Sequence, residues 1–170
     1  MLPILGAAGA PLTFEGMVIG GGIGVAANVG FQLVANGGNF SNINKVDAAM
    51  AGVAGTLTYG ATFASTVFIN TGTSLIASAF NNSNATDSRN AMLGAVVGSA
   101  LGYGFGSVAQ DVANPIFNPW YREEWKDMGL TIQKFIPPSK IPSVLGTWAG
   151  SATSEVGSAG ATNQISRQGN

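Results

Sequence analysis

Cysteine and histidine are both missing from this chain of 170 residues, and charged residues are scarce. Only 9% of the residues are Asp, Glu, Lys or Arg, whereas an average soluble domain carries about 25%. These absences exclude a disulfide scaffold, thiolate and imidazole metal sites, histidine-based triads and cysteine nucleophiles. The formal net charge of −1 argues against a nucleic-acid-binding surface, which needs a basic patch. We therefore expect no metal, no cofactor and no nucleic-acid partner.

Apolar and small residues make up most of the chain, with 46% hydrophobic residues and 25 glycines. Three runs contain no charge at all: residues 16–44, 48–86 and 90–110. Each is long enough for a bilayer-spanning helix, which needs about 20 mostly apolar residues. Polar residues such as Asn28 and Asn70 dilute them. The runs are therefore suited to a soluble bundle when they pack together and to a membrane when they do not.

Small residues recur at every fourth position within these runs. The rows are Gly16, Gly20 and Gly24; Ala48, Gly52, Thr56, Gly60 and Ala64; and Gly94, Gly98, Gly102 and Gly106. A step of four places each row on one helix face, whereas a strand would repeat every two residues. A face without side chains lets a second helix approach closely, as in the small-xxx-small packing of membrane helices. Bulky residues between the glycines, such as Leu101 and Phe105, disfavour a flexible linker.

The spacing predicts an all-α fold, a compact bundle of glycine-zipper helices followed by an amphipathic aromatic C-terminal segment. We expect helices over residues 16–35, 47–80 and 90–110. The predicted organisation is an N-terminal linker (1–15), a glycine-rich apolar helical domain (16–113), and an aromatic amphipathic segment with a polar tail (114–170).

Two features of the C-terminal third predict where helices stop. Asn114-Pro115 should end the glycine-rich helix, because a residue that precedes proline avoids the helical region. The segment from residue 162 to the end is polar and is expected to fray.

Aromatic and basic side chains are grouped after that predicted helix end. The group consists of Trp120, Tyr121, Arg122, Trp125 and Lys126. Trp and Tyr beside Arg and Lys are typical of an anchor at a membrane interface. The alternative is that the two tryptophans simply cover the helical core.

No motif predicts catalysis. Glu124 and Lys126, with Asp111 upstream, superficially match the acidic and basic groups of metal-dependent nucleases. That match needs only three common residue types, so surface ion pairs explain it better. The glycines of residues 20–24 lack the following Lys-Ser/Thr of a phosphate loop, so helix packing explains them better. We expect no catalytic residues and no enzymatic activity.

The order of motifs resembles a known family. Residues 40–47 (FSNINKVD) lead into the small-residue row of 48–60, and Asn70-Thr71-Gly72 comes next. The glycine row within 91–106 follows, and then Asn-Pro-Trp-Tyr-Arg-x-x-Trp-Lys-Asp at 118–127. This order resembles the C-terminal regions of CdiA-type filamentous-haemagglutinin exoproteins of contact-dependent growth inhibition systems, from about residue 16 to 150. The family's Val-Glu-Asn-Asn junction is absent, and no nuclease site follows.

The resemblance implies a secreted, cell-surface exoprotein whose C-terminal region acts at the inner membrane of a neighbouring bacterium. It also implies an integral membrane receptor in the target cell and a cognate immunity protein. The chain is then a membrane-active toxin region, either a translocation module or a complete pore-former. One alternative is a soluble helical module that docks on a receptor or immunity protein without inserting. Another is a small integral membrane channel subunit.

Overall fold

The regular elements of the chain are helices throughout the part that the computed structural model describes, residues 13–119 and 139–168. They are α1 (Phe14–Ala35), a short 3₁₀ helix η1 (Phe40–Asn42), α2 (Lys45–Thr58), α3 (Phe63–Phe80), α4 (Ala85–Phe117) and α5 (Ile141–Gln168). The predicted all-α class is therefore confirmed.

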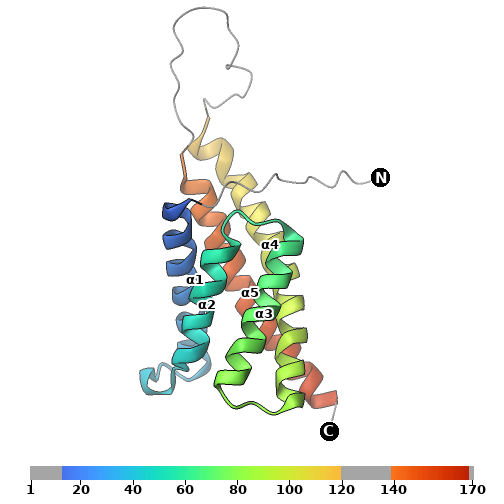
Figure 1. Cartoon of the computed structure of the whole chain (residues 1–170). Coiled ribbons are helices and arrows are strands. Elements are labelled where there is room, and N and C mark those ends of the chain that lie inside the picture. The colour runs from blue at the N-terminus through green and yellow to red at the C-terminus, as the bar shows by residue number, and fades with distance from the viewer. Residues whose placement is uncertain (1–12, 120–138, 169–170) are drawn as a thin grey trace, which may run out of the picture.

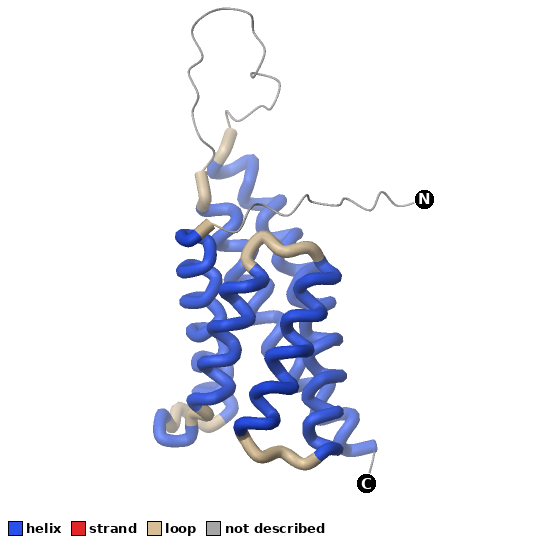
Figure 2. Tube along the Cα trace, in the orientation of Figure 1, coloured by secondary structure: helices blue, strands red, loops and turns tan. Residues whose placement is uncertain are grey.

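The five α-helices form a ring in which helices that follow each other along the chain are antiparallel, while α1 and α5 are parallel (Figures 1 and 2). Each helix packs against the next one along the chain, and α5 returns to contact α1, which closes the ring. The starts of α1, α3 and α5 lie at one end of the bundle with the ends of α2 and α4 (Figure 1). We call this the Lys140 end, and the opposite end, where α2 and α4 begin, the Asp47 end.

Polar residues start four of the helices. Thr13, Asn44, Thr62 and Asn84 occupy the N-cap positions of α1, α2, α3 and α4, and each side chain accepts a hydrogen bond from a backbone N–H of the first turn. These side chains satisfy donors that have no partner within the helix. Local capping residues therefore define where these four helices begin.

The predicted single helix over 47–80 is wrong, because the chain turns between residues 59 and 62. Gly60 has a φ of 72° in this turn, a left-handed conformation that glycine adopts without steric cost. Thr62 then caps α3. Gly60 therefore lies outside both helices, although its four-residue spacing had placed it in a packing row.

Two predicted helix ends are also wrong. α4 continues through Pro115 to Phe117, where the N–H of Asn118 donates to the carbonyl of Asn114 at 2.8 Å. Proline in the last turn removes only one backbone bond, so the turn survives. The described part of the polar tail is helical, since α5 runs to Gln168. The last turns of α5 are hydrogen-bonded to Asn90 of α4. Asn90 Nδ2 donates to Ser166 Oγ at 3.2 Å, and the Asn90 carbonyl accepts from Thr162 Oγ1 at 3.3 Å.

Candidate membrane surface and polar interior

The interior of the bundle contains small and polar side chains in place of a hydrophobic core. Among the described residues, the buried ones are glycines, Pro142, four alanines (Ala48, Ala77, Ala95 and Ala113) and five polar residues (Asn28, Thr73, Ser78, Asn90 and Ser99). None of the described Val, Leu, Ile, Met, Phe, Tyr or Trp residues is buried. A water-soluble domain has the opposite distribution.

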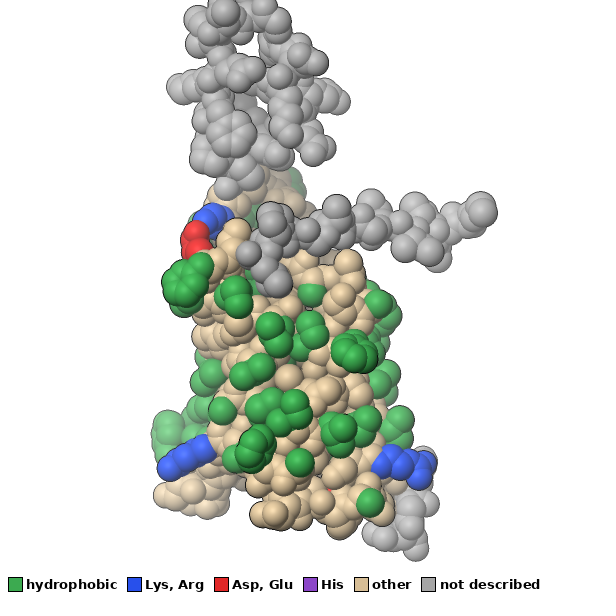
Figure 3. Space-filling model, in the orientation of Figure 1, with side chains coloured by type: hydrophobic (Ala, Val, Ile, Leu, Met, Phe, Trp, Pro, Cys, Tyr) green, Lys and Arg blue, Asp and Glu red, His purple; other side chains and the backbone are tan. Residues whose placement is uncertain are grey.

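The large apolar side chains point outward on every α-helix. Phe14 is 83% exposed, Phe68 80% and Phe105 60%. Even α5, the most polar helix, presents Ile141, Leu145, Trp148 and Val156 to the outside. Apolar side chains spread over the middle of the face seen in Figure 3. Large apolar side chains exposed on every helix are compatible with a membrane environment.

Charged side chains form two layers at the ends of this apolar belt. Lys45, Asp47, Asp87, Arg89 and Arg167 lie toward the Asp47 end, while Glu15, Asp111 and Lys140 lie toward the other end. On the face in Figure 3, the described charged groups are seen near the ends. α1 has 22 residues and so spans about 33 Å at roughly 1.5 Å per residue. That length matches a bilayer hydrocarbon core of about 30 Å.

Glycines bring the backbones of α1 and α2 together. A Cβ atom added to Gly20 would lie within 3.0 Å of the Gly55 carbonyl oxygen, and one added to Gly55 would meet the Gly20 carbonyl in the same way. Gly24 faces the carbonyl of Ala51 equally closely. Any larger side chain at these positions would push the two helices apart.

The α4–α5 pair is joined by a longer row of the same kind. A Cβ on Gly102 would lie 2.5 Å from the Gly150 carbonyl oxygen, and one on Gly106 would lie 2.8 Å from that of Gly146. Further along, Gly94 and Gly98 face serines of α5. The described part of α5 therefore supplies both glycines and small polar residues to this interface.

The predicted packing glycines fall into three groups in the structure. Those of α1 and α4 are all buried at helix contacts: Gly16, Gly20, Gly24, Gly94, Gly98, Gly102 and Gly106. Gly52 is half-buried, and a Cβ there would lie 2.7 Å from the side chain of Val25. Gly60 lies in the turn described above. The predicted interface residues Trp120, Tyr121, Arg122, Trp125 and Lys126 lie outside the described residues.

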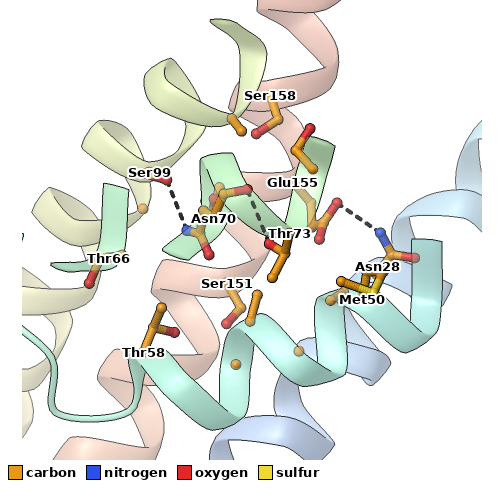
Figure 4. Close-up of a pocket in the computed structure, with 18 of the residues that line it drawn as sticks. Asn28, Met50, Thr58, Thr66, Asn70, Thr73, Ser99, Ser151, Glu155 and Ser158 are labelled. Carbon is orange, nitrogen blue, oxygen red and sulfur yellow. Dashed lines mark hydrogen bonds between the residues drawn. The ribbon is translucent and has the colours of Figure 1, made fainter. Parts of the chain in front are cut away.

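A cavity of about 1250 Å³ lies between the helices, and all five of them line it. Its walls extend from Asp47, Asn81 and Asp87 at one end of the bundle to Gln110 and Asp111 toward the other. Most of its lining consists of glycine, alanine, serine, threonine and asparagine. Figure 4 shows Asn70, Ser99, Ser151 and Glu155 around this space.

Glu155 is the single charged residue that the described helices carry between the two end layers. Its carboxylate faces the cavity and accepts a hydrogen bond from Asn28 Nδ2 at 3.0 Å (Figure 4). Gln32 Nε2 donates in turn to Asn28 Oδ1 at 2.6 Å, and Gln32 Oε1 accepts from the backbone N–H of Asn44 at 2.6 Å. A hydrogen-bonded chain thus runs from the middle of the cavity to the start of α2.

Other polar contacts join the remaining helices across the same space. Asn70 Nδ2 of α3 donates to Ser99 Oγ of α4 at 2.8 Å. Near the Asp47 end, Asn81 Nδ2 donates to Asp47 Oδ1 at 2.8 Å. Burial raises the pKa of Asp47 above its ordinary value, while the bond from Asn81 acts in the opposite direction. These contacts satisfy polar groups that would be costly to leave unpaired away from water.

The cavity and Glu155 were not predicted from the sequence. In the sequence, Asn28 and Asn70 merely interrupt apolar runs, whereas in the structure both line the cavity. The signal for α5 was present, since Gly146 and Gly150 are four residues apart and Ser151, Ser154, Ser158 and Thr162 recur three or four apart. Glu155 lies within this stripe and is its sole acidic residue.

Comparison of the chain with protein-family models, with curated proteins and with solved structures finds no match. Three described helices, α1, α3 and α4, are long and apolar enough to cross a membrane by length and composition. Function therefore has to be argued from the surface and the cavity.

Proposed function

We propose that this protein spans a membrane as a helical bundle and conducts small polar solutes or ions through its interior. The observation that carries the proposal is the inverted distribution of side chains. Large apolar groups cover the outside, and the buried residues are small or polar. The proposed pathway is the cavity that all five helices line.

The outer surface supports insertion on energetic grounds. Moving a side chain such as Phe68 or Phe105 from water to hydrocarbon gains about 1.5–3 kcal/mol, and such residues are exposed on every α-helix. A charged residue facing lipid would cost about 2.5–3.5 kcal/mol at the bilayer centre. Glu155, the charge nearest the middle, instead faces the cavity and is hydrogen-bonded to Asn28.

Glycine contacts explain how such a bundle holds together in lipid. The hydrophobic effect does not drive helices together in hydrocarbon, so association depends on close van der Waals packing and interhelical hydrogen bonds. The rows on α1 and α4 supply the first, through carbonyl contacts to α2 and α5. Asn28 and Asn70 supply the second. In this proposal the rows act as glycine zippers.

The resemblance to CdiA-type exoproteins supplies a biological setting for this activity. In that setting the chain is the membrane-active region of a contact-dependent toxin and acts at the inner membrane of a neighbouring bacterium. A membrane receptor and an immunity protein would be its partners. This setting can be tested separately from the pore by measuring bacterial growth. The chain would be expressed in the cytoplasm or delivered from outside, in each case with and without a candidate immunity protein.

The competing function is a soluble module that docks on a receptor without inserting. The two functions predict different surroundings for the apolar outer surface. In a docking module this surface would contact water or protein and not lipid. Purified protein added to liposomes distinguishes the two by alkaline carbonate extraction. We expect the protein to stay in the membrane fraction, and complete release would contradict insertion.

The absence of native cysteine allows a direct test of the pathway. Ser151 lines the cavity, while Val156 on the same helix is 61% exposed on the outer surface. We expect Ser151→Cys in planar bilayers to react with a charged methanethiosulfonate reagent, which should block most of the current. The matched Val156→Cys variant should keep its current, because a charged reagent does not reach a lipid-facing thiol.

Two results would contradict the proposal. Absence of any current from the reconstituted wild-type chain would argue against conduction. Equal modification of the two cysteine variants would argue that the interior of the bundle is not the aqueous path. Circular dichroism of both variants in the same detergent checks that the bundle remains folded.

A further inference from the structure

The sign of the charges along the cavity wall is uniform. Asp47, Asp87, Asp111 and Glu155 all line the cavity. The basic side chains of the described residues, Lys45, Arg89, Lys140 and Arg167, are all exposed and none of them lines it. Net charge does not reveal this separation, because acids and bases nearly balance over the whole chain. Within the described residues, the fold thus places four acids and no base on the cavity wall.

The four acids are spread along the length of the cavity. Asp87 and Asp111 are exposed near opposite ends of the bundle, and Asp47 is half-buried near the Asp47 end. Glu155 is half-buried and lies between the two end layers. An ion passing from one end of the bundle to the other would therefore meet a negative group near each end and another between them.

One of the five acids in the described residues does not line the cavity. Glu15 of α1 does not line the cavity, and its carboxylate forms an exposed ion pair with Lys140 Nζ. The acid with a basic partner is thus on the outer surface. The cavity acids Asp47 and Glu155 are hydrogen-bonded to neutral amides, those of Asn81 and Asn28, and not to a basic group.

Fixed charges of one sign in a narrow space with low-dielectric walls concentrate ions of the opposite sign. Rings of Asp and Glu give cation channels their selectivity in this way. The other polar groups of the lining include the hydroxyl and amide oxygens of Ser, Thr and Asn, which are ligands that hard cations accept. The lining therefore repels anions and offers oxygen ligands to cations.

We infer that the pathway through the bundle selects cations over anions, with Glu155 as the selectivity-determining residue inside it and Asp47, Asp87 and Asp111 concentrating cations at the two mouths. This inference rests on the proposed pore and names its substrate class. It concerns the sign of the permeant ion, so it can fail while the pore itself stands.

The test uses the full-length chain in planar bilayers of neutral lipid with a KCl gradient. We expect the wild-type reversal potential to lie close to that of K⁺, for a K⁺ over Cl⁻ permeability ratio of roughly tenfold or more. Glu155→Gln retains a carbonyl oxygen that accepts the bond from Asn28, and it should lower this ratio several-fold. Combining it with Asp47→Asn, Asp87→Asn and Asp111→Asn should bring the ratio close to unity.

Glu15→Gln is the matched control, because it removes an acid of the outer surface and should leave the reversal potential unchanged. Current without cation preference in the wild type would overturn the selectivity while leaving the pore intact. An unchanged ratio in the fourfold variant would overturn the role of these side chains. A silent wild-type protein would overturn the pore and this inference together.

Discussion

The α4–α5 and α1–α2 pairs both pack closely, but they do so through different residues. Between α1 and α2 the contact depends on reciprocal backbone approach, with Gly20 and Gly55 facing each other's carbonyls. Between α4 and α5 two such glycine pairs are extended by serines, since Gly98 faces Ser154 and Ser158. The first interface is the shorter one, because α2 has 14 residues, and the second is longer and adds the serines of α5.

This difference follows from the different polarity of α1 and α5. α1 is one of the three described helices that are long and apolar enough to cross a membrane by length and composition, and α5 is not among them. A helix with many polar residues needs a neighbour that receives its polar face, and α4 offers both a bare glycine row and polar side chains such as Asn90. α4 thus packs against α5, the most polar helix, and exposes Leu101, Phe105 and Val108 on its outer face.

The largest loss is expected from breaking the α4–α5 contact with Gly102→Leu. The new Cβ would lie 2.5 Å from the Gly150 carbonyl oxygen, so the helices must separate, at a cost of about 3 kcal/mol or more. Thermal unfolding in detergent should show a large drop in midpoint, and bilayer current should disappear. Gly104→Leu on the same helix is the control, since nothing lies within 4 Å of its Cβ position. Equal losses in both variants would contradict the proposed contact.

A smaller loss is expected from Gly20→Ala in the α1–α2 contact. Alanine gains up to about 1 kcal/mol in helix propensity, but its methyl group would overlap the Gly55 carbonyl. We expect a net destabilisation of about 1–2 kcal/mol. The comparison variant Gly22→Ala, which meets nothing within 4 Å, should be more stable than the wild type. If Gly20→Ala is also stabilised in a detergent titration, the two backbones do not approach as closely as described.

The smallest effect, and one of opposite sign, is expected in α3. This helix contacts its neighbours through side chains, including a T-shaped Phe63–Tyr103 pair with ring centroids 5.4 Å apart. A Cβ on Gly72 meets nothing within 4 Å. Gly72→Ala should therefore stabilise the bundle by about 0.5–1 kcal/mol through helix propensity alone. A loss of stability would indicate an unrecognised close contact at this face.

Much of the fold could be predicted because it is encoded over short distances. The four-residue spacing of Gly94 to Gly106 fixes a helix face independently of its partner, and the charge-free runs place the apolar segments. Errors arose where two local signals competed. Small residues continued in step through Gly60, yet its positive φ and the Thr62 cap make a turn there. Pro115 was weighted as a stop, but near a helix end it removes only one hydrogen bond.

The polar interior was harder to predict because it depends on residues that are distant in the chain. Asn28 and Glu155 are hydrogen-bonded although 127 positions separate them, and no local pattern pairs them. Composition also does not distinguish a polar residue that interrupts an apolar run from one that faces a shared cavity. In each helix the inward direction is defined only by its neighbours.

The sequence by itself determined that the chain is helical, poor in charge and able to pack through bare glycine faces, because helix periodicity and solvent preference act residue by residue. Tertiary structure decided which face of each helix turns inward. Once the glycines of α1 and α4 had brought α2 and α5 into backbone contact, the apolar side chains were left on the outside and four acids on the wall of one cavity. Among the described residues, only the packed bundle brings these four acids to one cavity wall without a base, because that placement depends on contacts between five helices rather than on any one of them.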